Sequence, residues 1–225
     1  MKKYAPRKVF IIENGEYVEI SYEELCRREG IDPSYKDMSS TLNTLSIAHR
    51  FIKEHARPGD FWIDGTAGRG YDTAFLCELV GEEGRVLSFD IQEDAIESTK
   101  ALLREKEFSW AQVIADSHSN MERYAKEGKV GGIVFNFGYL PGGDHSICTR
   151  AETSIQAIDK GLTLLRPGGV MSLCIYYGGD SGFDEKNALM DYLKTVDSKR
   201  YTVLVTDFYN RPNCPPIAVF ILKDC

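Results

Sequence analysis

Four polar side chains recur at or near the ends of successive predicted strands: Asp64, Asp90, Asp116 and Asn136. Carboxylates accept hydrogen bonds from hydroxyl and amine groups, and an amide oxygen can do the same. Parallel α/β sheets bind their ligands outside the carboxyl ends of the strands. The spacing therefore predicts that these four side chains lie along one ligand-binding edge of a sheet.

A glycine-rich loop joins the first of these strands to a helix. The loop contains Asp64, Gly65, Thr66, Ala67, Gly68, Arg69 and Gly70, and Asp72 and Thr73 open the helix. Glycines let the backbone turn sharply and approach a ligand closely. The same pattern also suits a tight strand–helix turn that binds nothing. The P-loop signature G-x-x-x-x-G-K-[ST] is absent from the sequence, which disfavours a P-loop NTPase.

Asp90 ends the next predicted strand in the run Asp90-Ile91-Gln92. It follows the glycine loop by about twenty residues, where an acidic residue typically accepts hydrogen bonds from ribose hydroxyls. Ile91 is placed to pack on an adenine face, and Gln92 is grouped with the same cofactor contacts. The alternative role of Asp90 is that of a helix N-cap, and the two roles are compatible.

Asp116, Ser117 and His118 close the third strand. They are candidates to contact the adenine edge or the methionine part of a cofactor. His118 has a second interpretation, as a solvated loop residue or a partner of Asp116. A single histidine does not by itself indicate acid–base chemistry.

The segment Asn136 to Asp144, NFGYLPGGD, follows the fourth strand and is the most informative motif. Asn136 can accept a hydrogen bond from an amine, and Tyr139 can stack on a nucleobase. The segment is similar to the [DN]-P-P-[FY] motif of amino-methyltransferases, with Phe137 and Gly138 in place of the prolines. The alternative is a rigid Pro-Gly-Gly loop without a chemical role.

Strands and helices alternate along most of the chain, which predicts a parallel sheet with helices on both faces. We expect one antiparallel strand, because the last two strands are joined without a helix. The expected strands are 61–66, 85–91, 110–115, 132–137, 170–177, 201–208 and 217–222. The expected helices are 41–56, 72–80, 93–106, 153–165 and 184–196, and a further helix begins at about Ser119, where Ser119 and Glu122 can form a capping box. Pro167-Gly168-Gly169 is expected to end the helix 153–165.

The first 39 residues form a separate predicted module. Lys8–Ile12 and Tyr17–Ile20 alternate like strands around Asn14-Gly15, a strong hairpin signal. Ser21 to Glu24 is a capping box for a short helix, and residues 31–39 read as a linker. Residues 40–225 are then the main domain. Three roles stay open for residues 1–39: RNA binding, homodimerisation, or covering of a sheet edge.

Composition is that of an ordinary globular protein of 225 residues, with 43% hydrophobic and 27% charged residues. The sequence has no apolar run of membrane-spanning length and no signal-peptide pattern, so we expect a cytoplasmic protein without a membrane partner. The six cysteines form no C-x-x-C pair, so no metal site is expected. The net charge of −7 argues against coating of nucleic acid, although it permits binding of one small RNA loop.

Residues from about Leu45 to Asp224 resemble the MnmM-type (YtqB-like) bacterial tRNA methyltransferases, a family also described as "putative rRNA methylase". The resemblance is carried by Asp64–Leu76, Phe89–Gln92, Ser117-His118, Asn136–Asp144, Thr153 with Ala157, Glu185–Asn187 and Asn210–Pro216. It implies a class I, Rossmann-like methyltransferase fold that uses S-adenosylmethionine and releases S-adenosylhomocysteine. It also implies methylation of the amine of 5-aminomethyl-2-thiouridine at the tRNA wobble position, with the anticodon stem-loop as partner.

The sequence departs from the family pattern at three positions. Arg69 and Tyr71 replace the usual Asn and His of the loop, and Gly179 stands where the family has His. These departures leave the exact substrate open, and methylation of rRNA or of a small-molecule amine are alternatives on the same fold. The glycine loop also permits a NAD-dependent oxidoreductase, because fold alone does not fix function, and a non-catalytic cofactor- or RNA-binding module is a further alternative.

The expected mechanism is in-line methyl transfer to a neutral amine, which depends mainly on positioning. Asn136 would orient the nitrogen, Tyr139 would support the base, and Asp72 would orient the cofactor or accept a proton through water. Substrate contacts are expected from Tyr139, Gly142, Gly143, Arg150 and Arg211, with Arg50, Lys53 and Arg69 as further basic candidates. His49 is assigned either to helix packing or to RNA contact.

Overall fold

The computed structural model describes residues 8–13, 16–21, 42–138, 149–177, 182–212 and 214–224. The chain divides into two units, Met1–Asn43 and Thr44–Cys225. In the first unit, β1 (Lys8–Glu13) and β2 (Glu16–Ser21) pair antiparallel, with Glu13 opposite Glu16. This confirms the predicted hairpin, because only two residues connect the strands. The predicted capping box and the linker 31–39 lie outside the described residues.

The second unit contains the alternating elements expected from the sequence. Its strands are β3 (Phe61–Asp64), β4 (Arg85–Asp90), β5 (Ala111–Ala115), β6 (Val130–Phe137), β7 (Leu165–Ile175), β8 (Tyr201–Thr206) and β9 (Ile217–Lys223). Its helices are α3 (Thr44–His55), α4 (Tyr71–Val80), α5 (Glu93–Glu105), the 3₁₀ helix η1 (His118–Arg123), α6 (Ala151–Leu164) and α7 (Gly182–Leu193). None of these helices has the length and apolar character needed to cross a membrane.

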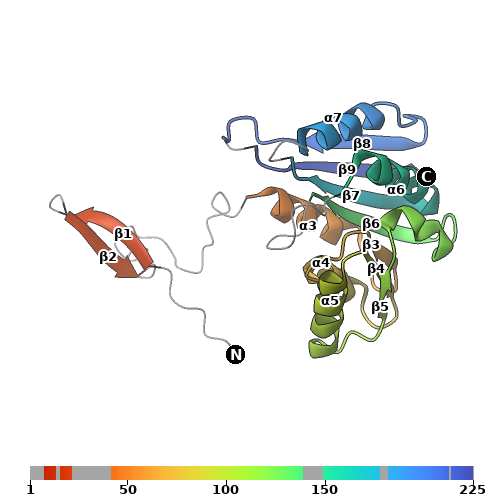
Figure 1. Cartoon of the computed structure of the whole chain (residues 1–225), viewed down its shortest axis with the longest axis horizontal. Helices are drawn as coiled ribbons and strands as arrows, with labels where there is room; N and C mark the ends of the chain where they lie inside the picture. Colours follow the sequence, from red (N-terminus) through yellow and green to blue (C-terminus); the bar gives the residue numbers. More distant parts are fainter. Residues whose placement is uncertain are drawn as a thin grey trace. The chain divides into compact units, whose positions relative to one another are not determined.

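The seven strands form one sheet in the order β5-β4-β3-β6-β7-β9-β8 (Figure 1). Neighbouring strands run parallel except where β9 lies antiparallel between β7 and β8. This confirms the predicted Rossmann-like sheet with one antiparallel strand. The strand order reverses between β3 and β6, and ligands of doubly wound sheets bind at such a switch point. The candidate site residues follow these two strands and their neighbours.

Helices cover both faces of the sheet. Successive residues of a strand point to opposite sides, so each strand contributes apolar side chains to the core on either face. On one side, Ile63 of β3 and Phe135 of β6 pack in a core that includes Ile158 of α6. On the other side, the adjacent residues Trp62 and Val134 pack in a core with α3 and α4. Helices α3 and α4 on one face and α6 on the other therefore support β3 and β6, the two strands that carry Asp64 and Asn136.

Two local predictions are wrong. The turn after β5 is a 3₁₀ helix capped by Ser117, whose hydroxyl accepts from the Ser119 amide at 3.2 Å. The predicted capping partner Glu122 instead pairs with Lys160 at 2.6 Å. Helix α6 ends at Leu164, and Pro167-Gly168-Gly169 lie inside β7 beside an irregular register with β6, rather than ending the helix.

Candidate active site

Asp64 shapes the glycine loop from inside the protein. Its carboxylate accepts the Thr66 amide at 3.1 Å and the Thr73 hydroxyl at 2.6 Å, which ties β3 to the first turn of α4. The side chain is fully buried. Burial, followed by the charge of Asp72, raises the pKa of Asp64 to about 7. Asp64 and Thr73 were predicted to bind a cofactor, and the structure buries both side chains and joins them by a hydrogen bond.

Two glycines of the loop are required by close approach of other elements. A Cβ atom on Gly65 would lie 2.2 Å from the Phe135 ring. Gly70 has a φ of +81°, and a Cβ there would lie 2.9 Å from the Thr99 Cα. The loop is therefore pressed against β6 and α5, and this packing sets the path of its backbone.

Asp90 binds the glycine loop and keeps capacity for a ligand. One carboxylate oxygen accepts the Gly68 amide at 3.0 Å, and the other accepts the Gln92 amide at 2.9 Å. Each oxygen has a second lone pair, which suits a pair of ribose hydroxyls. Ile91, next along the chain, is 66% exposed and offers an apolar surface beside that acid. These residues fit the nucleoside part of S-adenosylmethionine.

Asp116 at the end of β5 is fixed by its own neighbours. It accepts hydrogen bonds from Asn120 at 2.7 Å, Tyr124 at 2.9 Å and the Ser117 amide at 2.7 Å. The hydrogen bond from Asn120 is the largest of the causes that lower the pKa of Asp116. Asp116 thus stays a carboxylate whose orientation is set before any ligand arrives.

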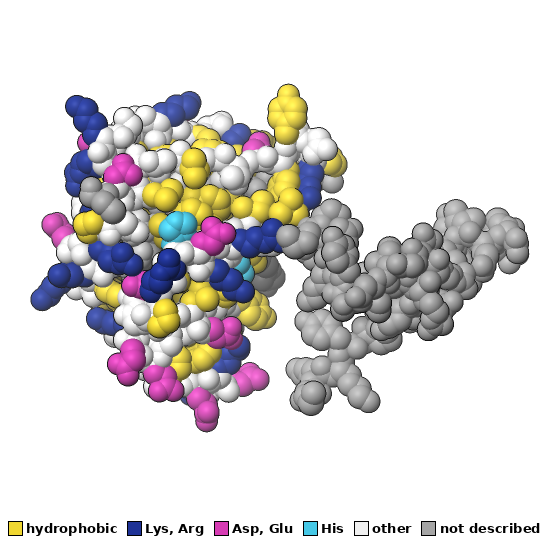
Figure 2. Space-filling model, turned by 180° about the vertical axis from the view of Figure 1, so that it is seen from behind, with side chains coloured by type: hydrophobic (Ala, Val, Ile, Leu, Met, Phe, Trp, Pro, Cys, Tyr) yellow, Lys and Arg dark blue, Asp and Glu magenta, His cyan; other side chains and the backbone are white. Residues whose placement is uncertain are grey.

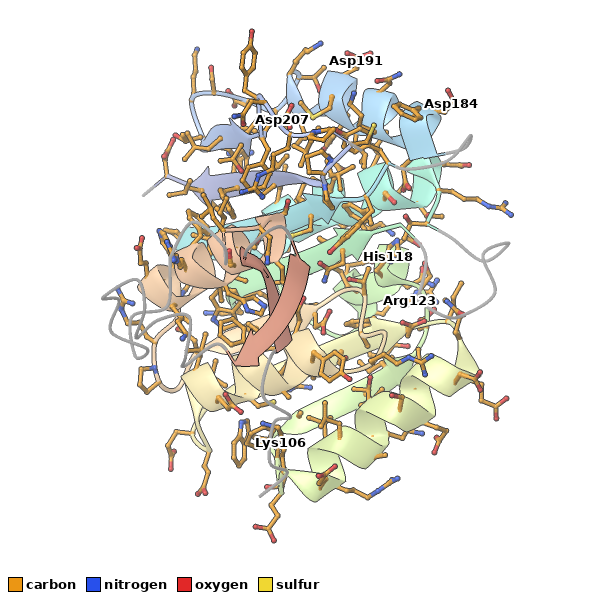
Figure 3. The ribbon with its side chains drawn as sticks, turned by 90° about the vertical axis from the view of Figure 1, so that its left-hand side faces the viewer. Lys106, His118, Arg123, Asp184, Asp191 and Asp207 are labelled. Atoms are coloured by element: carbon orange, nitrogen blue, oxygen red, sulfur yellow. The ribbon has the colours of Figure 1, made fainter. Side chains whose placement is uncertain are left out.

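His118 is packed inward, which contradicts its interpretation as a solvated loop residue. Its ring meets Phe135 and Phe137 edge-on, at centroid distances of 5.9 and 6.0 Å. In Figure 3 His118 is labelled near the middle of the view, whereas Asp191 is labelled near the top and Lys106 in the lower part. Burial lowers the pKa of His118, so the neutral ring is favoured. Its Nε2 atom is buried and has no hydrogen-bond partner among the described residues. A buried nitrogen of this kind is suited to a ligand contact at the edge of the site.

Asn136 lies at the switch point and is held from two sides. Its backbone amide donates to the Thr66 hydroxyl at 2.7 Å, and its side-chain Nδ2 donates to Asp72 at 2.7 Å. The second Asp72 oxygen lies 2.7 Å from Nε2 of His49 on α3. The His49 ring in turn stacks on Phe75, with centroids 4.0 Å apart. Of the two roles predicted for His49, helix packing is present, together with a direct contact to the site that the sequence did not suggest.

The described residues on either side of positions 139–148 are hydrogen-bonded to each other. Tyr139, Gly142 and Gly143 lie outside the described residues, so their substrate contacts stay predictions. The Thr149 amide donates to the Gly138 carbonyl at 2.9 Å, and the Gly138 amide donates to the Thr149 hydroxyl at 2.8 Å. The Thr149 hydroxyl donates onward to the buried Glu185 of α7 at 2.8 Å.

The predicted basic residues Arg69 and Arg150 are exposed, at the glycine loop and at the start of α6. Arg211, between β8 and β9, lies over the Phe208 ring at 3.9 Å, next to the fully exposed Tyr209. On the face drawn in Figure 2, basic and acidic side chains are interspersed and acidic ones gather along the lower edge. In the part of the chain that the structure describes, no group of three metal-ligating side chains comes together.

The comparisons with known proteins agree with this geometry. The family model described as "Putative rRNA methylase" matches residues 86–222. A chloroplastic protein of Arabidopsis thaliana, "tRNA (mnm(5)s(2)U34)-methyltransferase", is 34% identical over 187 residues, which cover 79% of this chain and 68% of that protein.

The chain belongs to this methylase family.

Solved structures of family members carry the same fold. An rRNA methylase-like protein from Clostridium thermocellum is 49% identical, with a TM-score of 0.79, and covers 81% of this chain and 98% of its own. A methyltransferase from Streptococcus mutans in complex with SAH is 32% identical, with a TM-score of 0.74, over 81% of this chain and 98% of its own. The chain is therefore an S-adenosylmethionine-dependent methyltransferase.

A second family model, "Protein-L-isoaspartate(D-aspartate) O-methyltransferase (PCMT)", matches residues 3–128. That range includes the glycine loop and Asp90 but ends before Asn136. Of the two models, only the methylase model covers residues 129–222, which include Asn136, Arg150 and Arg211.

Sequence reasoning missed several contacts of the site. It did not pair His49 with Asp72, because the two lie 23 positions apart on different helices. It also missed Asn120 and Tyr124 as the residues that hold Asp116. Glu185 was named only within the family resemblance, and a buried glutamate in a helical pattern has no other signal in the sequence.

Proposed function

We propose that this methyltransferase transfers a methyl group to the aminomethyl nitrogen of 5-aminomethyl-2-thiouridine at the wobble position of tRNA. The observation that carries this proposal is the Asn136 side chain, held by Asp72 at 2.7 Å beside the glycine loop. An amide fixed in this way suits an amine nucleophile, and the relative from Arabidopsis thaliana is named for this tRNA modification. We place the reaction in the bacterial cytoplasm, a reducing compartment that fits the scattered cysteines of the sequence.

The cofactor site is assigned to the residues that fit it. Asp90 would accept the ribose hydroxyls, Ile91 would pack on the adenine, and His118 would meet the ligand through its buried Nε2 atom. S-adenosylmethionine, when bound there, supplies a methyl group on a sulfonium that an amine can displace. The protein's part is to hold the two reactants in line, which can contribute ~7–11 kcal/mol to catalysis.

The nucleophile must be a neutral amine, because an ammonium has no lone pair. The substrate ammonium therefore loses one proton to water before transfer. Oδ1 of Asn136 then accepts a hydrogen bond from the amine N–H and aims the lone pair at the methyl group. The C–S bond breaks as the N–C bond forms, and the positive charge passes from sulfur to the methylated nitrogen. This scheme needs no strong general base and no covalent enzyme intermediate.

RNA contacts are assigned to the loops at the same edge of the sheet. Arg150 and Arg211 would meet phosphates, and Tyr209 is fully exposed in the loop that follows β8. The exposed Tyr209 ring offers a face on which a base can stack, a contact worth roughly 1–3 kcal/mol. Tyr139 keeps its predicted role of supporting the target base.

The decisive experiment incubates the enzyme and labelled S-adenosylmethionine with tRNA from a strain that lacks this terminal methylation. The nucleosides are then resolved by mass spectrometry. We expect the label in 5-methylaminomethyl-2-thiouridine. Parallel reactions contain ribosomal RNA or small-molecule amines. Ribosomal RNA is included because a protein of Alteromonas mediterranea named "Ribosomal RNA small subunit methyltransferase H" is 26% identical over 68% of this chain and 43% of its own length. Label in ribosomal RNA alone, or in small amines alone, would overturn the tRNA assignment.

A further inference from the structure

The side chains of His49, Asp72 and Asn136 form a hydrogen-bonded row whose direction is fixed by chemistry. The Asp72 carboxylate has no hydrogen to donate, so both neighbours must donate to it. One oxygen lies 2.7 Å from Nε2 of His49, and the other lies 2.7 Å from Nδ2 of Asn136. Nε2 of His49 therefore carries the hydrogen in this contact.

The same constraint fixes the amide of Asn136. An amide can be turned end for end with little change of shape, and its orientation is read from its partners. Because Nδ2 is bound to Asp72, Oδ1 is the atom left for the substrate. An Asp72 carboxylate that swung away would release the amide, and Nδ2 could then face the amine and repel its N–H groups.

The contacts of the His49 ring restrict that movement of the Asp72 carboxylate. Its ring is stacked on Phe75 of α4, with centroids 4.0 Å apart and planes 18° apart. Phe75 lies one turn after Asp72 on the same helix, so the ring and the carboxylate are held by one element. The side chains of His49 and Asp72 are 30% and 14% exposed, so water competes only in part for this contact.

We propose that His49 is a positioning residue of the methyl-transfer site. By donating from Nε2, it fixes the Asp72 carboxylate, which in turn presents Oδ1 of Asn136 to the substrate amine. This inference rests on the proposed function for its consequence in catalysis. The hydrogen-bonded row itself can be tested without any substrate.

Two substitutions separate the hydrogen bond from the packing. His49→Phe keeps a ring on Phe75 and removes the N–H donor, whereas His49→Gln removes the ring and supplies an amide donor. We expect His49→Phe to lower kcat roughly ten-fold, the cost of a hydrogen bond to a charged group. We expect His49→Gln to keep kcat within about three-fold of the wild type, with the Kd for S-adenosylhomocysteine unchanged in both. Equal losses of kcat in the two variants, or none in His49→Phe, would overturn the positioning role.

A second readout stays valid if tRNA proves not to be the substrate. The side-chain amide signals of Asn136 are recorded by NMR of ¹⁵N-labelled full-length protein, and are assigned by their loss in Asn136→Ala. We expect these signals to shift in His49→Phe and to lie near the wild-type position in His49→Gln. Signals unchanged in both variants would overturn the inference, whatever the enzyme methylates. If the wild-type enzyme does not methylate tRNA but the NMR signals shift as expected, the proposed function is rejected and the positioning role of His49 is kept.

Discussion

Asp72 and Asn136 stand 64 positions apart in the sequence, and their side chains meet at 2.7 Å across the switch point of the sheet. Asp72 comes from the first turn of α4, and Asn136 comes from β6. The contact joins the loop that fits the cofactor to the strand that would present the substrate. Five expected outcomes follow from this arrangement and its surroundings.

Asn136→Ala is expected to lower kcat by roughly 100-fold, because the amine would lose the group that aligns it. The Kd for S-adenosylhomocysteine should stay within about two-fold, since the backbone amide that binds Thr66 is retained. Single-turnover kinetics and calorimetry measure the two quantities. Near-normal turnover in this variant would contradict the mechanism.

Asp90→Ala is expected to weaken binding of S-adenosylhomocysteine by roughly 10- to 100-fold, the effect of losing hydrogen bonds to a charged group. Asp94→Ala is the matched control, because Asp94 is an exposed acid in the first turn of the following helix. Calorimetric titration of both variants decides the matter. Equal affinities in the two would remove Asp90 from the cofactor site.

Asp64 should make folding less favourable as pH rises. Its pKa is raised from 3.8 to about 7, so the unfolded chain releases this proton at a lower pH than the native protein does. The native state consequently loses stability from about pH 4 to pH 7 and no further above it. Asp64→Asn cannot ionise, so its free energy of unfolding relative to wild type should improve between pH 5 and pH 8. Urea unfolding at the two pH values tests this, and a constant difference would refute it.

Thr149→Val removes the acceptor for the Gly138 amide and the donor to Glu185. We expect a loss of about 1–3 kcal/mol in the free energy of unfolding, because a buried acceptor and a backbone donor lose their partner. We also expect kcat to fall several-fold, since Gly138 and Thr149, which flank the predicted substrate residue Tyr139 in the sequence, are joined through this hydroxyl. Thr149→Ser should restore both. Ser154→Ala, which removes only the other hydroxyl on Glu185, serves as control and should leave kcat near normal.

Arg211→Ala is expected to raise the KM for tRNA several-fold and to reduce its dependence on salt, as loss of one phosphate contact does. The turnover of saturated enzyme should change little. Arg85→Ala is the control, because Arg85 opens β4 at the opposite edge of the sheet. KM values measured at two salt concentrations provide the test, and identical salt slopes in the wild type and Arg211→Ala would contradict the RNA role.

Local pattern alone determined much of this protein. All seven strands of the main sheet were predicted from the sequence, and the helix-free connection before Ile217 predicted the antiparallel strand. The position of the glycine loop between β3 and α4 and that of Asp90 at the end of β4 were also predictable, because each depends on a short stretch of chain. The errors were local as well: the helix after Ala115 is a 3₁₀ helix capped by Ser117, and Pro167 lies within β7, beside an irregular register with β6.

Tertiary structure decided what the polar side chains do. Asp64 looked like a ligand contact, but the packing of α4 on β3 buries it and gives its carboxylate to Thr66 and Thr73. His49 could be assigned no partner from sequence, because its distance to Asp72 is set by how two helices dock on one face of the sheet. A hydrogen bond depends on the position of single atoms, whereas a strand depends on a repeating pattern. For that reason the fold and the strand ends that carry the candidate site could be predicted from the sequence. The hydrogen bonds from His49 through Asp72 to Asn136 depend on how the helices and strands pack in the folded protein.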